Sequence, residues 1–239
     1  MIRSPFSTLI EREIRRRLRE EFRTTLPRFD LMAQLEKSPT GMTVGAGSAA
    51  YNIALNGSSN SIAGATTFAN TGTVTLGNGG DTTAFTDGVT ATAPSAITVN
   101  GTVSAAGTGV ITLGDSNTAL TIGGTSTIGG TSTGQITTGA INLNNNLTIG
   151  AGAATPISLT TVTGPSSGSA NLTINTTGAV TVSGAVGTNI GTLTITNSGG
   201  TTFSNTVNAT TVTLTDTTGA ITFNNYKFGC VASVWLHNK

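Results

Sequence analysis

The chain has 239 residues and a net charge of +1, but this charge is the sum of two very different regions. Residues 1–44 hold nine of the eleven basic residues and six of the ten acidic ones, whereas residues 45–226 contain no Lys or Arg and only four Asp. The charge-poor region does not fit ordinary disorder, which couples low hydrophobicity to high net charge, and no stretch is apolar for long enough to cross a bilayer as a helix.

Residues 1–44 are predicted to form a helical head. The pattern indicates an amphipathic helix followed, after a break at Thr24-Thr25, by a second helix that starts near Pro27 and ends before Ser38-Pro39. In the first helix apolar residues recur every four positions, at Phe6, Ile10, Ile14, Leu18 and Phe22. In the second helix the apolar side is predicted to hold Phe29, Met32 and Leu35. Such a pair has too small a core to fold alone.

The run Leu18-Arg19-Glu20-Glu21-Phe22-Arg23, within the segment Leu9–Glu36, resembles the start of MarR-type winged-helix transcription regulators. The resemblance covers residues 1–44 and implies a first helix that takes part in dimerisation and a second that supports the winged helix. The chain then changes to Gly45-Ala46-Gly47-Ser48, so the recognition helix of that family is missing. A DNA-binding fragment of such a regulator is therefore the alternative function.

A cluster of arginines in the head supplies the candidate non-specific contacts with nucleic acid: Arg12, Arg15, Arg16, Arg17, Arg19 and Arg23. Charge runs on amphipathic helices are more often solvated faces, and neighbouring Glu residues reduce the positive field. Nucleic acid is therefore not expected to be a partner. Self-association through the first helix is expected instead.

Residues 45–61 are predicted to be a linker, and residues 62–225 a β-strand repeat. Gly- and Asn-rich turns separate the strands, because these residues tolerate positive φ. Alternation of apolar and polar residues indicates half-buried strands with the aliphatic side chains inward. Twelve short units carry the alternation, with Thr, Asn or Ser between two apolar residues: 74–76, 97–99, 111–113, 120–122, 141–143, 147–149, 157–159, 172–174, 180–182, 193–195, 212–214 and 221–223.

The spacing of these units favours a solenoid. The interval from Leu120 to Ile141 equals that from Leu172 to Leu193, and it is about the size of one coil built from two or three short strands. We therefore predict a mainly β chain that forms a right-handed parallel β-helix after two N-terminal helices. An antiparallel β-sandwich is the alternative, although it usually needs larger core residues than the few Phe here.

The run Gly191-Thr192-Leu193-Thr194-Ile195-Thr196-Asn197-Ser198-Gly199-Gly200 resembles the β-strand repeats of filamentous-haemagglutinin-like outer-membrane proteins and autotransporter passengers. The resemblance spans residues 62–225 and implies an extended adhesin stalk exported to the cell surface. Host or cell-surface glycans and proteins would then be the partners of the solenoid, and its open ends could associate with other copies. We therefore expect a structural or adhesive segment of a bacterial surface or secreted protein.

Catalysis is not expected, because the repeat has four isolated Asp and no His, Lys or Arg to work with them. We predict no cofactor and no metal site. The turn Gly77-Asn78-Gly79-Gly80-Asp81 faintly resembles a calcium-binding turn, but a single copy favours a plain glycine turn. Threonines line up along Thr192–Thr196 and Thr211–Thr215 as an ice-binding solenoid would require, but their spacing is expected to drift between coils.

Residues 226–239 are predicted to be an atypical tail, either a cap of the solenoid or a non-native extension. The tail holds the only Trp, His and Cys, namely Trp235, His237 and Cys230. A lone cysteine excludes an intramolecular disulfide and a cysteine-based zinc site.

The two resemblances belong to different compartments, which predicts a chimeric or truncated reading frame. The segment from Met1 to Thr25 lacks the unbroken apolar stretch of a secretory signal, so the chain as written is expected in the cytoplasm although the repeat is typical of the cell surface. Sequencing the locus across the codons for residues 40–50 tests this prediction. We expect a junction there, and one uninterrupted native frame in a cultured organism would contradict it.

Overall fold

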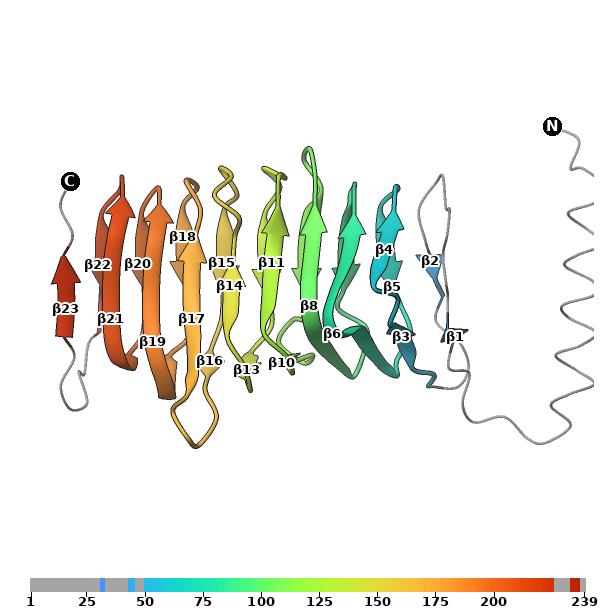
Figure 1. Ribbon diagram of the computed structural model, residues 1–239, viewed down its shortest axis with the longest axis horizontal. Coiled ribbons are helices and arrows are strands. Elements are labelled where there is room, and N and C mark those ends of the chain that lie inside the picture. The colour runs from blue at the N-terminus through green and yellow to red at the C-terminus, as the bar shows by residue number, and fades with distance from the viewer. Residues whose placement is uncertain (1–30, 33–42, 46–49, 226–232, 237–239) are drawn as a thin grey trace, which may run out of the picture.

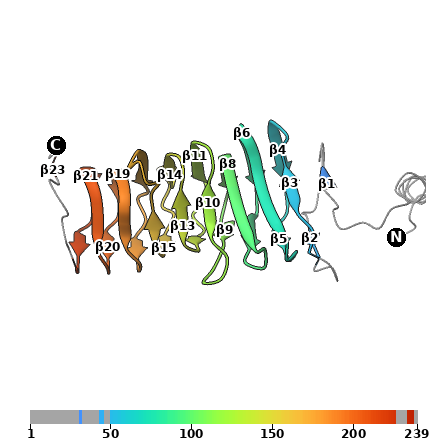
Figure 2. The same ribbon diagram turned by 90° about the horizontal axis from the view of Figure 1, so that it is seen from below.

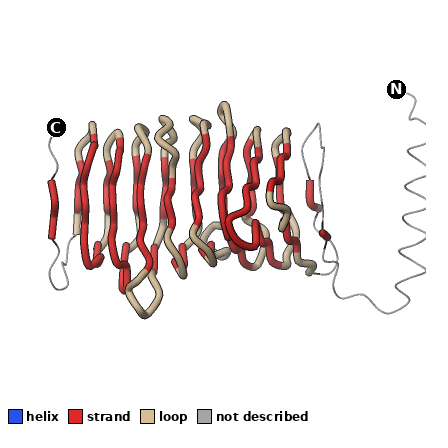
Figure 3. The backbone as a smooth tube through the Cα atoms, viewed as in Figure 1, coloured by secondary structure: helices blue, strands red, loops and turns tan. Residues whose placement is uncertain are grey.

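The computed structural model describes residues 31–32, 43–45, 50–225 and 233–236. These residues form a parallel β-solenoid of about eight coils that stack side by side along the long axis of the molecule (Figure 1). Every strand pairing in the described part of the chain is parallel, and the strands form two sheets, A and B. None of the described residues is helical, so none belongs to a helix long and apolar enough to cross a membrane (Figure 3).

Sheet A has two rows of strands because β6, β8, β19 and β21 are long enough to bend and take part in both. The first row contains β1 (Leu31–Met32), β3 (Ile53–Leu55), β6 (Thr73–Phe85), β8 (Ala96–Ala105), β10 (Leu120–Ile122), β13 (Ile141–Leu143), β16 (Val162–Thr163) and the starts of β19 (Val186–Ser198) and β21 (Val207–Thr217). The second row contains β4 (Ser59–Ile62), the ends of β6 and β8, β11 (Ser126–Gly130), β14 (Leu147–Ile149), β17 (Ala170–Asn175), the ends of β19 and β21, and β23 (Ser233–Leu236).

Sheet B closes the third side of each coil, and Figure 2 shows the same stack turned by 90°. Its strands run in chain order along the stack, each paired with those of the coils before and after it. They are β2 (Thr43–Val44), β5 (Thr66–Phe68), β7 (Gly88–Ala91), β9 (Val110–Leu113), β12 (Ile136–Thr138), β15 (Ile157–Leu159), β18 (Val180–Val182), β20 (Thr201–Phe203) and β22 (Ile221–Phe223).

The regular spacing predicted from the sequence does correspond to one coil. Leu120 pairs with Ile141 and Leu172 with Leu193, and all twelve predicted units lie within strands. Coil length nevertheless varies, because the pairing of Leu193 with Val212 closes a shorter coil than the pairing of Leu147 with Leu172. The solenoid is therefore confirmed, and the antiparallel sandwich is wrong.

The core is a set of aliphatic columns that run along the inside of the stack. In the first row, Ile97, Leu120 and Ile141 occupy successive positions of one column and are at most 1% exposed. Burial of each such side chain contributes about 1.5–3 kcal/mol relative to leaving it in water. Because each coil is thin, an aliphatic side chain buries its surface mainly against the same position of the coils on either side.

Two boundaries differ from the prediction. Leu31 and Met32 form a strand on β3 instead of part of a second helix, because their backbone pairs with Ile53 and Ala54. The range 45–61 is not simply a linker, since it includes β3 and most of β4, and Ile53 lies in the core. The predicted helices otherwise lie outside the described residues. In the predicted tail, β23 continues the second row of sheet A by pairing with β21.

Buried hydroxyls connect successive coils at the corner between the second row and sheet B. Thr176, which is fully buried, donates to the carbonyl of Thr155 in the preceding coil at 2.6 Å and accepts the N–H of Gly178 at 2.9 Å. The same corner of neighbouring coils carries Ser132, Thr155 and Ser198. These side chains satisfy backbone groups that the turn would otherwise bury without a partner.

We expect Thr176→Val to lower the free energy of unfolding by about 1–3 kcal/mol, because it leaves buried backbone groups unpaired while keeping the shape of the side chain. Thr138→Val is the matched control. The Thr138 hydroxyl is also buried but has no hydrogen-bond partner among the described residues, so its removal should be neutral or stabilising. Urea denaturation of both variants measures the difference, and equal losses of stability would contradict the assigned role of the Thr176 hydroxyl.

Candidate binding surface

Stacking in register places one polar residue of each coil directly over that of the next. On sheet B the central outward positions form a column of hydroxyls: Thr67, Thr90, Thr112, Thr137, Ser158, Thr181, Thr202 and Thr222. In most of these strands the residues before and after the column residue are buried. Because side chains alternate between the two faces of a strand, the column residue therefore points to the surface. The hydroxyls are about 4.8 Å apart, the spacing of adjacent strands.

The second row of sheet A carries a corresponding column of eight hydroxyl residues. The column consists of Ser59, Thr82, Thr102, Thr127, Thr148, Thr173, Thr194 and Thr213. We call the outer surface of this second row the threonine face. All eight side chains are exposed or half-buried, which fits their outward position.

The expectation that threonine spacing drifts between coils is wrong. Thr192 pairs with Thr211 and Thr194 with Thr213, so both ranks stay aligned. Coils of unequal length hide this alignment in the sequence, because the extra residues enter at the corners and leave the strands in register. Sequence reasoning therefore missed a hydroxyl column that runs from β4 to β21, where the next paired position, on β23, is Trp235.

The aspartates of the solenoid do not belong to either hydroxyl column. Asp87 and Asp115 are exposed in turns, and the Asp115 carboxylate accepts the N–H groups of Asn117 at 2.8 Å and Thr118 at 2.9 Å. Asp216 lies near the end of β21, beyond the column position Thr213. No residue of either hydroxyl column is charged.

The turn Gly77–Asp81 forms a bulge in β6 between the two rows of sheet A. Asp81 is 8% exposed, and its carboxylate accepts the N–H of Asn78 at 2.7 Å. The side chain of Asn100 in the next coil donates to the Gly77 carbonyl at 3.0 Å. Gly101 must be a glycine here, because its φ is +143° and a Cβ would overlap the Asp81 backbone.

This arrangement closes a turn around a single carboxylate. Calcium takes six to eight oxygen ligands, several of them from carboxylates. In the part of the chain with assigned structure, no group of three or more His, Cys, Asp or Glu residues comes together. The carboxylate of Asp81 instead stabilises the loop through its charge-assisted hydrogen bond.

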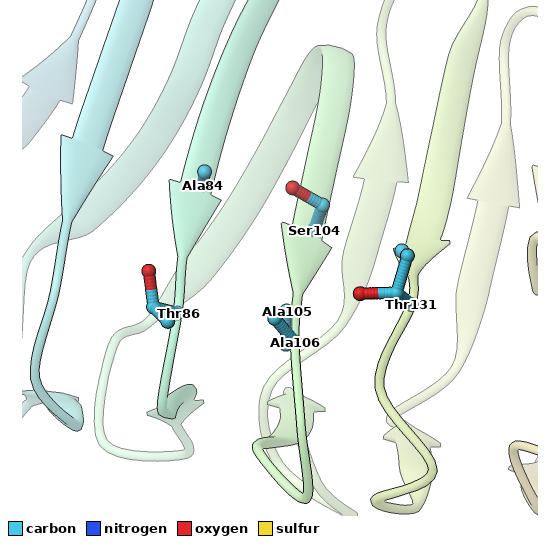
Figure 4. Close-up of a pocket in the computed structure, with 7 residues that line it drawn as sticks. Ala84, Thr86, Ser104, Ala105, Ala106 and Thr131 are labelled. Carbon is cyan, nitrogen blue, oxygen red and sulfur yellow. The ribbon is translucent and has the colours of Figure 1, made fainter.

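A shallow groove of about 200 Å³ lies at one border of the threonine face (Figure 4). Its lining is made of small residues, among them Ala84, Ala106 and Gly130. Thr86, Ser104 and Thr131 surround it with hydroxyls. The groove is open and neutral, and it offers neither a nucleophile activated by a base nor a charged group.

The remaining candidate residues fall outside the described part of the chain. They are Arg12, Arg15, Arg16, Arg17, Arg19 and Arg23, together with Cys230 and His237. The structure therefore brings none of the predicted nucleic-acid contacts into a described site.

Comparison of the chain with protein-family models, with curated proteins and with solved structures gives no significant match. The comparisons thus lend no support to a winged-helix regulator. The likeness to filamentous-haemagglutinin-like repeats rests on the sequence pattern and is consistent with the parallel solenoid. The fold defines the class, a parallel β-solenoid repeat protein.

We expect Asp81→Ala to lower the free energy of unfolding by about 1–3 kcal/mol, because it removes a charge-assisted hydrogen bond in a buried turn. The control is Asp87→Ala at an exposed turn, for which we expect a change within about 0.5 kcal/mol. Thermal or urea denaturation with and without added calcium measures both. A calcium-dependent gain in stability that Asp81→Ala abolishes would contradict the plain turn and assign an ion to the loop.

Proposed function

We propose that the solenoid is a non-catalytic structural or adhesive segment of a bacterial surface or secreted protein. The observation that carries the proposal is the unbroken parallel stack of coils from β3 to β22. A solenoid grows in one dimension, so each added coil separates its two ends by about 4.8 Å. About eight coils make a spacer about 38 Å long.

The backbone pairing of the coils supports a stiff spacer. N–H groups at the start of one strand donate to the following coil at regular positions, as in Leu120 to Ala140 at 2.8 Å and Ile141 to Thr161 at 2.8 Å. Aliphatic columns continue through the same coils. Bending the stack would break hydrogen bonds and core contacts together, so the two ends are held at a fixed separation.

The outward hydroxyls support an adhesive role. Each hydroxyl can donate and accept a hydrogen bond, which suits the many hydroxyls of a glycan. A long flat surface with repeated weak contacts gains affinity from the number of contacts it makes. Cell-surface glycans, or proteins that carry them, are therefore the proposed partners, and export to the cell surface is part of the same proposal.

We expect the purified full chain to bind members of a panel of immobilised cell-surface glycans, measured as retention under flow. A triple variant Arg15→Ala, Arg16→Ala and Arg17→Ala should bind equally well, because the proposed contacts come from the solenoid. Ile149→Asp places a charge in the core, where Ile149 is fully buried, and should abolish binding together with the β signal in circular dichroism.

Two results would contradict the adhesive role. Loss of binding in the arginine variant would assign the contacts to electrostatics of the head. Absence of retention on every glycan would remove the adhesive part of the proposal. Small-angle scattering then tests the spacer by itself, since a compact particle in place of an elongated one would contradict it.

A further inference from the structure

We propose that two copies of this chain associate laterally through their threonine faces. This surface is the outer side of the second row of sheet A, centred on the column from Ser59 to Thr213. The inference does not depend on adhesion or on a surface location. It follows from the area, the charge and the regularity of the face.

The area of the threonine face is close to what a stable dimer needs. Eight strands carry the column, and at about 4.8 Å between strands it is about 34 Å long. The strands of the column have unequal lengths: β14 has three residues, β4 four, β11 five and β17 six, and the parts of β19 and β21 in this row are longer. At about 3.3 Å per residue the face averages about 18 Å in width. The resulting area of about 600 Å² is about three quarters of the roughly 800 Å² that each partner buries in a typical specific interface.

Sheet B offers a smaller surface. Its strands β5, β12, β15, β18, β20 and β22 have three residues each and β7 and β9 have four, so the face is only about 11 Å wide on average. Its area is therefore about three fifths that of the threonine face, well below the size of a specific interface. The two surfaces otherwise resemble each other, since both carry a central hydroxyl column.

The charge of the threonine face favours another neutral surface as its partner. Its column residues are all Thr or Ser, and Asp81 of β6 is buried beneath the surface. Isolated charges would otherwise prevent close approach of two copies, because desolvating an unpaired charge is costly. A partner with a strongly charged surface would find no complementary group among the column residues.

The regular column also fits a copy of itself. A two-fold axis between Thr127 and Thr148, at the middle of the column, would align all eight hydroxyl positions of one copy with the eight of the other. Each Thr presents a methyl group and a hydroxyl, so two such surfaces can pack methyl against methyl and exchange hydrogen bonds between hydroxyls. Thr148 is partly exposed in the single chain, so it is accessible for this contact.

The test uses Thr148→Lys in the full chain. A lysine there points outward and should leave the coil folded, but in the dimer it brings two like charges together near the axis. We expect the wild-type chain to dimerise in sedimentation equilibrium and the variant to dimerise at least about tenfold more weakly, because like charges facing each other across an interface are strongly disfavoured.

Thr137→Lys is the matched control, because Thr137 lies one coil before Thr148 at the central outward position of sheet B. It adds the same charge and should leave dimerisation unchanged. Circular dichroism melting checks that both variants fold, and Thr127→Lys, the neighbouring column position on the other side of the axis, replaces Thr148→Lys if that variant unfolds.

Three results would overturn the proposal. A monomeric wild-type chain would do so, and its incorporation into growing ice would then assign the threonine face to an ice surface. Equal weakening by both lysine variants would show a general effect of charge. A dimer that neither variant weakens would place the contact at the N-terminal segment or at the ends of the solenoid.

Discussion

The parallel pairing of each coil with the next is the constraint on which the rest of the structure depends. In the first row of sheet A, the N–H of Ile97 donates to Ala119, that of Leu120 to Ala140 and that of Ile141 to Thr161. A single coil of a solenoid cannot satisfy its own backbone or bury its own aliphatic side chains, so both requirements are met by the neighbouring coils. Fold, core and surface columns all follow from keeping this register.

Because the strands must stay in register, variation in the sequence is confined to the corners. The coil between Leu147 and Leu172 is longer than the coils on either side of it, and its extra length forms the loop between β16 and β17 that projects from the stack in Figure 1. Small and polar residues make these corners, as Asp81 does at the Gly77 turn and Thr176 at another corner. Their side chains substitute for strand partners where the backbone changes direction.

The strength of the sequence signal depended on which residue faces inward. Units such as Leu120-Thr121-Ile122 have aliphatic residues at both inward positions, and every predicted unit of that kind is a strand. Strands such as β4, with Asn60 inside, and β12, with Thr138 inside, break the pattern and were not predicted. In β4 the side chain of Asn60 donates to Thr83 of the next coil at 3.3 Å, so a polar pair replaces an aliphatic contact. Alternation of hydropathy cannot detect such a pair, because both members score as polar.

The hydroxyl columns were hidden for a different reason. Thr127, Thr148 and Thr173 stand in one line on the surface, yet the interval between the first two in the chain differs from that between the last two. If a single repeat length is assumed, these three threonines do not fall at equivalent positions of the repeat. The pairing of the inward Leu and Ile residues nevertheless aligns them. Register is set by the buried side of a strand, and the exposed side inherits it. The surface order of this solenoid is thus a consequence of its core.

Because the core sets the register, charged residues lie at the corners of the solenoid and uncharged residues on its faces. Charged side chains keep flat β-surfaces apart in most proteins, and a net charge near zero promotes association. Here the exposed Asp87 and Asp115 lie in turns, while the flat faces present Thr and Ser. Placing charges at the corners preserves the stacking of identical residues from coil to coil, because like charges one strand apart would repel. The uncharged faces therefore follow from the same stacking that stabilises the coils, and they are the surfaces through which the solenoid is best suited to meet another flat, neutral body.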